Sequence, residues 1–456
     1  MLYLLVLMLL NGLAHNEGFI LEFRLEPVPE VPINILDGVL AVGLFWGLFR
    51  FRQSPNLFTA DQVHPLFRWL MMLFIPALIF GSVLGLANDV PIRRVLTMMR
   101  NFAVMPVSVF IGYAFLGTPK AARWIPYIYV FAGLGAAMSI MLFFKEASHD
   151  YSREVVSLSP LRTISYVSNY AGLGVAIVLF SILVKVRLFP LPLALLIGGI
   201  SLIGQFATLS RSDWLACIAG MLVVYYLLPP GERGGRMITG VFLGTVMALA
   251  LWIGIAVASQ TTGVDFTEKM NERFWSLLPE SVADTGEPRA WHQRLPATVE
   301  ELKMWSSSPL IGRGFAIQDG ARLVQGKATA GYRHNTWIST LAETGLLGFS
   351  AMALVVGGSF AIGRRMVREQ VDAGSVLIGG MGVITAAHYF VHGICTMSFN
   401  QMRFAIPLGV VCGLVLRCRA MQQTIIRRAW DKHRQSKQVS NASVFPGQET
   451  VKMFEV

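Results

Sequence analysis

The chain has 456 residues, of which 54% are hydrophobic and 14% are charged, and its net charge is +11. Soluble globular proteins carry about 25% charged residues, so the composition excludes a soluble enzyme, a disordered chain and a disulfide-rich secreted scaffold. Basic loops facing the cytoplasm explain the positive charge better than a nucleic-acid partner does. The composition therefore predicts an all-α, polytopic integral membrane protein without a nucleic-acid partner.

Long apolar segments recur along the chain, and about 20 apolar residues are needed to cross a bilayer. The predicted spans cover residues 1–14, 33–49, 69–87, 96–117, 124–144, 166–184, 188–209, 213–228, 238–257, 338–362, 374–397 and 402–416. The first segment is short. It lacks the basic start and clean cleavage site of a signal peptide, so a tilted or incomplete span is favoured. The expected count is about twelve transmembrane helices (11–12).

Lysine and arginine residues indicate the orientation. With the amino terminus in the cytoplasm, the short cytoplasmic loops hold twelve of them and the tail after residue 416 holds eight. The opposite face holds nine outside its one long loop, and long loops are not counted. Both termini are therefore predicted to be cytoplasmic. The basic tail, 417–456, is interpreted as a solvated anchor near anionic lipid.

Residues 258–337 interrupt the hydropathy pattern between the ninth and tenth predicted spans. The segment is polar and irregular, with nine basic and nine acidic residues. A long segment without a hydrophobic period is usually functional or disordered, and the motif at its end favours function. The predicted organisation is thus spans one to nine (1–257), a large outer loop (258–337), spans ten to twelve (338–416) and the tail (417–456).

Nine basic residues remain on the outer side: Arg24, Arg93, Arg94, Arg100, Lys145, Arg153, Arg162, Arg211 and Arg403. A cation near the bilayer is costly, and an arginine can clamp a phosphate through two parallel hydrogen bonds. The group therefore indicates a lipid-linked phosphate or diphosphate substrate. Contact with lipid head groups is the alternative, and it is favoured for Arg24 and Arg153.

Arg211 has a more informative setting, a tight turn that reads Thr208-Leu-Ser-Arg-Ser-Asp-Trp-Leu-Ala216. Ser210, Ser212 and Asp213 are candidate caps for the helix that follows. Helix amino termini attract anions, so Arg211 is predicted to project where a phosphate binds. An Arg211–Asp213 ion pair is the structural alternative.

A second motif closes the long loop: Arg333-His-Asn-Thr-Trp-Ile-Ser-Thr-Leu-Ala-Glu-Thr-Gly-Leu-Leu-Gly348. Asn335 or Thr336 is expected to cap the next helix. His334 then stands at the mouth of the membrane core, where an imidazole suits general base catalysis near neutral pH. A purely structural hydrogen bond is the alternative. Upstream, the turn at 308–315 contains a proline and two glycines and is expected to re-enter toward the membrane.

These motifs resemble the O-antigen ligase and Wzy-type polymerase superfamily, over roughly residues 190–415. That family has a Ser-Arg-Ser/Gly turn, a Pro-Leu-x-Gly-x-Gly-Phe/Tyr turn and a His-Asn-x-x-Leu-x-x-Leu-x-Glu-x-Gly-Leu-x-Gly signature. They correspond here to Ser210–Ser212, Pro309–Phe315 and His334–Gly348. Two residues depart from the pattern. Ile338 replaces a frequent leucine and keeps the apolar face, whereas Arg313 replaces a small residue and is either an extra phosphate contact or a local variation.

The resemblance implies a GT-C-like, inverting glycosyltransferase that needs neither metal nor cofactor. Its donor is a glycan on undecaprenyl diphosphate, and its acceptor is lipid A–core for a ligase or the growing polysaccharide for a polymerase. The enzyme lies among the membrane lipids of the bacterial inner membrane, with its active site facing the periplasm. The shared motifs do not separate ligase from polymerase. No outward Asp-x-Asp pair or Cys/His cluster in the loop suggests a metal site.

The predicted roles follow from this comparison. Arg211 is expected to clamp the diphosphate and His334 to act as the base. Five further residues are predicted to contact diphosphate or glycan: Arg93, Arg94, Arg162, Arg313 and Asn335. His388 and His392 are also candidates, although their i,i+4 spacing favours interhelical hydrogen bonds. A lipid-linked glycan flippase or transporter is a competing class, disfavoured by the single asymmetric loop. A non-catalytic membrane scaffold is another.

Overall fold

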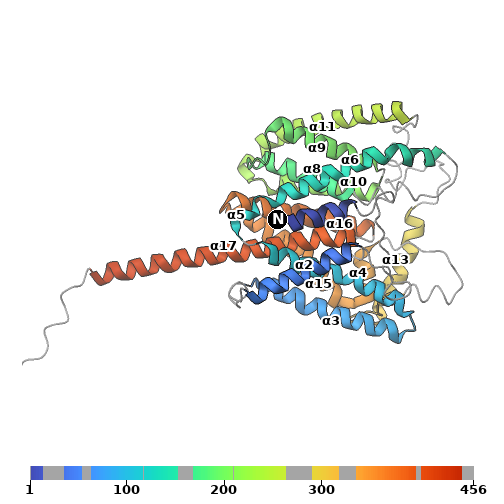
Figure 1. Ribbon diagram of the computed structural model, residues 1–456, viewed down its shortest axis with the longest axis horizontal. Coiled ribbons are helices and arrows are strands. Elements are labelled where there is room, and N and C mark those ends of the chain that lie inside the picture. Colours follow the sequence, from blue (N-terminus) through green and yellow to red (C-terminus); the bar gives the residue numbers. More distant parts are fainter. Residues whose placement is uncertain are drawn as a thin grey trace, which may run out of the picture.

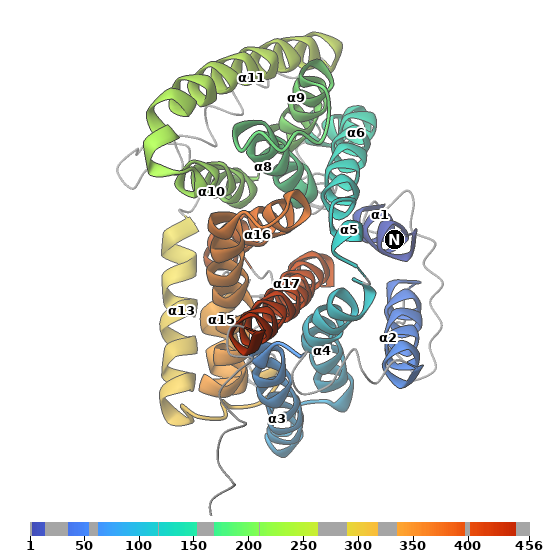
Figure 2. The same ribbon diagram turned by 90° about the vertical axis from the view of Figure 1, so that its left-hand side faces the viewer.

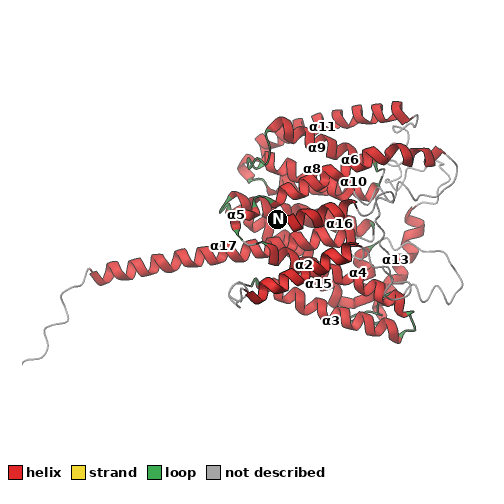
Figure 3. Cartoon of the chain, in the orientation of Figure 1, coloured by secondary structure: helices red, strands yellow, loops and turns green. Residues whose placement is uncertain are grey.

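The computed structural model describes residues 2–13, 35–53, 63–116, 118–152, 168–208, 210–262, 290–317, 335–396 and 402–443. Helices are the regular elements of these ranges, and no strand occurs in them (Figure 3). The elements are α1 (Leu2–Leu13), α2 (Ile35–Gln53), α3 (Pro65–Ala87), α4 (Ile92–Phe115), α5 (Pro119–Ala122), α6 (Ile125–Ser152), α8 (Ser168–Leu183), α9 (Leu191–Ala207), α10 (Arg211–Leu227), η2 (Pro230–Glu232), α11 (Arg233–Thr262), α13 (Ala290–Ser307), α15 (Thr336–Glu369), α16 (Ala373–Cys395) and α17 (Met402–Ser443).

Each of the twelve predicted apolar segments overlaps one of these helices. Five helical stretches in the described ranges are long and apolar enough to cross a membrane: α3, α4, α15, α16 and residues 404–424 of α17. The bent pair formed by α10 and residues 230–246 raises that number to six, and three further apolar helices are shorter. The prediction of a helical membrane protein is therefore confirmed, whereas the count of twelve spans stays a prediction.

The membrane-crossing part of α17 is the centre of the molecule. Figure 2 looks along this helix and shows α3, α4, α15 and α16 around it. Residues 404–416 are all buried, although helices of a monomeric bundle usually expose one face to lipid. The helices α6, α8, α9 and α10 form a second group beyond α16. Small residues such as Gly112 of α4 and Gly413 of α17 let the backbones approach closely, as is common between membrane helices.

The two ends of the bundle differ. In Figure 1, the last part of α17 projects from one end, and α13 lies across the other end. Contacts of basic side chains gather at the end with the projecting helix. Arg50 of α2 donates to the carbonyl of Ala114 at 3.3 Å, and Arg236 of α11 donates to that of Leu183 at 2.6 Å. Basic residues from separate predicted cytoplasmic loops therefore lie at one end of the bundle.

Two predicted boundaries need correction. The segment 258–337 was expected to be irregular, but it contains α13, and α11 extends into it as far as Thr262. Hydropathy does not detect α13 because Ala290–Ser307 carries charges and polar groups, although alanine, leucine, glutamate, lysine and methionine favour helix. The predicted twelfth span ends at 416, but α17 runs without a break to Ser443. Helix continues there because residues that favour helix, mainly arginine, glutamine, lysine and alanine, follow the apolar segment.

Candidate active site

Arg211 is the first residue of α10, directly after a tight turn. Ser210 is the N-cap residue with an extended backbone (φ −91°, ψ 109°), but its side chain makes no capping hydrogen bond. Its Oγ lies 3.2 Å from the Oγ of Ser212 and does not accept from a backbone N–H of the helix. The expected serine cap at Ser210 is therefore wrong. The partly exposed Arg211 stands beside backbone N–H groups that favour an anion.

Asp213, in the first turn of α10, points into the protein. Its Oδ1 lies 2.8 Å from Nε2 of His392 on α16, and both side chains are at most 3% exposed. One turn earlier on α16, Nε2 of His388 lies 2.8 Å from Oδ1 of Asn169 on α8. Both histidines therefore make the interhelical hydrogen bonds that their spacing favoured. Among the described residues, no group of three His, Cys, Asp or Glu side chains is arranged to hold a metal ion.

The start of α15 lies against the end of the same helix, α16. Asn335 is the N-cap residue, and its Oδ1 accepts from the backbone nitrogens of Trp337 and Ile338 at 3.0 and 3.2 Å. The cap predicted from the sequence is confirmed at Asn335. Thr336 donates to the carbonyl of Thr396 at 2.7 Å, and the indole of Trp337 donates to that of Phe390 at 3.3 Å. The C-terminal end of α16 thus contacts the first turns of both α10 and α15.

The turn at 309–315 interlocks with a kink in α15. Gly345 has φ 62° and ψ −160°, so this helix is not the straight span that hydropathy predicts. The nitrogen of Leu346 bonds to the carbonyl of Pro309 at 2.9 Å, and that of Arg313 bonds to the carbonyl of Ala342 at 2.8 Å. Backbone groups of the turn thus form hydrogen bonds with the backbone groups of α15 that the kink leaves without a partner inside the helix. Gly312, at φ 71°, lies so close to α15 that a Cβ would be 2.5 Å from the carbonyl carbon of Glu343.

The same turn docks onto the last two turns of α3. Phe315 is buried, its nitrogen donates to the carbonyl of Gly81 at 2.7 Å, and its ring centroid lies 5.4 Å from that of Phe102. The amide of Asn88, just after α3, donates to the carbonyl of Arg313 at 3.0 Å. Arg313 therefore lies beside the α3–α4 turn.

Arg93 and Arg94 begin α4 directly after that turn. Arg313 is exposed, and its guanidinium donates to the Oγ of Ser307 at 3.3 Å. The structure thus brings three predicted arginines to one region, apart from the Arg211 turn. His334 and Arg162 lie outside the described residues.

Three buried carboxylates of the site were missed or misread in the sequence. Glu301 of α13 accepts from the Oγ of Ser339 at 2.9 Å, and Glu343 accepts from the nitrogen of Ala316 at 3.3 Å. Asp213 was considered only as a cap or as a partner of Arg211. A carboxylate inside or beside an apolar helix is itself a signal of a specific partner, because burying it unpaired is costly. Tertiary contacts decide which partner that is.

A bundle of apolar helices, five of them in the described ranges long enough to cross a bilayer, defines a class, the helical membrane proteins. The O-antigen ligase family matches residues 196–353 of the chain, which hold the Arg211 turn, the turn at 309–315 and the motif that begins α15. All three motifs of the resemblance therefore lie within the part of the chain that matches this family. The comparison with curated proteins gives no match.

Proposed function

We propose that this chain is an inverting, GT-C-type glycosyltransferase of about twelve membrane spans that transfers a glycan from undecaprenyl diphosphate to an acceptor hydroxyl. The acceptor in this proposal is lipid A–core, as for an O-antigen ligase. The reaction takes place at the periplasmic face of the inner membrane, with both termini in the cytoplasm. One observation carries the proposal: the Arg211 turn and the start of α15 contact the same end of α16, within the segment that matches the family.

Arg211 is proposed to hold the diphosphate of the donor. A guanidinium binds two phosphate oxygens in parallel, and the helix dipole at the start of α10 adds to the attraction for an anion. During transfer, negative charge grows on the leaving diphosphate as its bond to the anomeric carbon breaks. A cation already in place stabilises that charge without reorganisation. Arg93, Arg94, Arg162 and Arg313 are proposed further contacts for phosphate or glycan.

His334 is proposed to accept the proton of the acceptor hydroxyl. The hydroxyl oxygen attacks the anomeric carbon from the side opposite the diphosphate, and so the configuration of that carbon inverts. His334 directly precedes Asn335, which caps α15 beside the end of α16. No metal takes part, since the leaving group is already activated and Arg211 neutralises its charge.

A transfer assay tests this proposal. It uses purified protein in detergent or nanodiscs, a lipid-linked glycan donor, lipid A–core as the acceptor, and excess chelator. The parent protein should transfer glycan to lipid A–core, and Arg211→Ala should lose about 10²–10³-fold in turnover. Arg211→Lys keeps the charge but not the planar fork, so it should remain impaired while exceeding the alanine variant. His334→Ala should slow transfer by about 10²–10⁴-fold with donor binding nearly intact.

The same assay contains the outcomes that contradict the proposal. Transfer to a second lipid-linked glycan, but not to lipid A–core, would identify a polymerase. Loss of activity on chelation, restored by a divalent ion, would refute metal independence. A folded Arg211→Ala protein that transfers glycan at the parent rate would remove Arg211 from the mechanism.

A further inference from the structure

A buried polar layer lies behind the Arg211 turn, and the proposed chemistry does not use it. It consists of Asn169 on α8, Asp213 on α10, and His388 and His392 on α16, all at most 2% exposed. The two imidazole rings are parallel within 8°, with centroids 6.3 Å apart. The ring of His392 also packs on Phe404 of α17 at 4.7 Å. Such groups are costly to bury unless each has a partner, so their pairing is specific.

The Asp213–His392 contact has favourable electrostatics at both of its ends. Asp213 lies in the first turn of α10, where the helix dipole favours a negative charge, and His392 lies in the last turn of α16, where it favours a positive one. The arrangement suits a hydrogen bond in which the imidazole Nε2–H donates to Oδ1. The two helix ends are thereby joined at 2.8 Å.

The end of α16 also holds the start of α15. Thr396, at the C-cap of α16, accepts the hydroxyl of Thr336 with its carbonyl, and its own nitrogen donates to the carbonyl of His392 at 2.9 Å. A short bonded path therefore runs from Asp213 through His392 and Thr396 to the first residue of α15. Arg211 lies two residues before this path begins, and His334 lies two residues before it ends.

We propose that His392 is a positioning residue. Through Asp213 it holds the Arg211 turn, the proposed diphosphate clamp, at a fixed distance from the start of α15, the helix that the proposed base precedes in the sequence. The proposal rests on the proposed glycan transfer. Loss of the contact leaves a buried carboxylate without this donor, and the first turn of α10 is then held less firmly against α16.

The contrast between the two histidines supports this assignment. His388 has the same burial and the same 2.8 Å bond length, but its partner is Asn169 of α8. His388 also interacts with the backbone of Ala216 on α10, but its side-chain partner Asn169 is on α8, whereas His392 contacts the side chain of Asp213, two residues from Arg211. Burial does not distinguish the two histidines; the position of the partner side chain relative to Arg211 does.

Steady-state kinetics on full-length protein, with the donor concentration varied at saturating acceptor, test the role of His392. His392→Asn should raise the donor KM by about tenfold, because its shorter side chain does not reach Asp213. His392→Gln places an N–H near the position of Nε2 and should bring the donor KM to within about threefold of the parent. The KM for the acceptor should change little in both variants.

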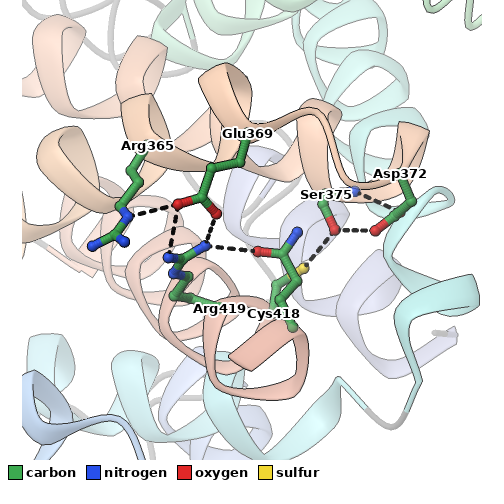
Figure 4. Close-up of polar contacts among 7 residues, drawn as sticks. Arg365, Glu369, Asp372, Ser375, Cys418 and Arg419 are labelled. Carbon is green, nitrogen blue, oxygen red and sulfur yellow. Dashed lines mark hydrogen bonds and ion pairs between the residues drawn. The ribbon is translucent and has the colours of Figure 1, made fainter. Parts of the chain in front are cut away.

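A matched control comes from the opposite end of the bundle. Glu369 of α15 accepts hydrogen bonds from Arg419 of α17 and from Arg365, which lies one turn earlier on α15. Figure 4 shows these contacts. Glu369→Gln weakens a tie between two membrane helices far from Arg211. It should lower the Tm in detergent as much as His392→Asn does, without a change in the donor KM.

The outcomes separate this inference from the proposed function. A parent protein that transfers no glycan would refute the function, whatever the His392 variants do. The positioning role alone would be refuted if the parent protein transfers glycan and the folded His392→Asn and His392→Gln variants both have the donor KM of the parent. If His392→Asn does not fold, Asp213→Asn weakens the same contact from α10. An unchanged donor KM in that folded variant likewise overturns the inference.

Discussion

Gly345 is the residue at which the loop turn and the membrane bundle meet. Its backbone angles, φ 62° and ψ −160°, belong to a region that only glycine adopts without strain. A Cβ there would lie 2.5 Å from the nitrogen of Gly312 in the docked turn. The requirement for glycine therefore comes both from the backbone angles of the kink and from the contact with residues 309–315.

Replacing Gly345 with alanine should destabilise the protein. The backbone strain alone costs about 1–3 kcal/mol, and the clash with the turn adds to it. Thermal unfolding in detergent should show a Tm several degrees lower for Gly345→Ala. Gly357→Ala is the control, because Gly357 lies on the same helix with nothing within 4 Å of its would-be Cβ. Equal melting temperatures for the two variants would contradict this account of the kink.

At the scale of elements, α13 connects the long loop to the bundle. Its buried Glu301 accepts from Ser339 in the first turn of α15, and the indole of Trp305 donates to the carbonyl of Pro309 at 3.1 Å. One helix thus contacts both the start of α15 and the docked turn. This arrangement explains why a polar helix without a strong apolar face keeps a defined place.

Removing the carboxylate of Glu301 should loosen α13. A buried hydroxyl that loses its acceptor costs about 1–3 kcal/mol, so amide exchange in α13 should accelerate by about 5–100-fold for Glu301→Ala. Hydrogen–deuterium exchange read by mass spectrometry on peptides of residues 290–307 measures this effect. Glu300→Ala is a matched control, because Glu300 is the neighbouring residue and is exposed. Equal exchange in both variants would show that the Glu301–Ser339 contact does not hold the helix.

At the scale of the whole molecule, the ends of the bundle carry different charge patterns. Arg365, Glu369 and Arg419 join α15 to α17 at the end from which α17 projects, close to the Asp372–Ser375 cap of α16 (Figure 4). Arg50 and Arg236 bind helix-end carbonyls at the same end. Basic loops remain on the cytoplasmic side during insertion, which assigns this end to the cytoplasm in our proposal.

Reporter fusions should agree with that orientation. Fusions after residues 236 and 370 should report the cytoplasm, because both positions follow basic loops at the α17 end. A fusion near residue 290, at the start of α13, should report the periplasm. Alkaline phosphatase and green fluorescent protein, active on opposite sides of the membrane, provide paired readouts. A cytoplasmic signal near residue 290 would place the loop on the wrong face for a flipped lipid-linked donor and would refute the proposed reaction.

The helices themselves were largely predictable because apolar length is a local property of the chain. Segments such as 374–397 and 213–228 differ by only a few residues from α16 and α10. The helix α13 was not predictable in this way, since its place depends on Glu301 and its neighbours meeting α15. The N-cap at Asn335 was predictable because a capping side chain bonds only to the next few residues. The expected cap at Ser210 failed, because the Oγ of Ser210 lies closest to that of Ser212.

The sequence by itself determined the membrane class, the positions of the apolar helices and, through three motifs, the resemblance to the O-antigen ligase family, which residues 196–353 match. These properties depend on residues close together in the chain, where hydrophobic length and local hydrogen bonds decide. Only the tertiary structure decided that Asp213 pairs with His392, that the turn at 309–315 bends α15 at Gly345, and that Arg313 joins the α3–α4 turn. Each of these contacts joins residues far apart in sequence. A buried polar or backbone group must find a partner, and many partners are chemically equivalent until packing brings one of them within reach.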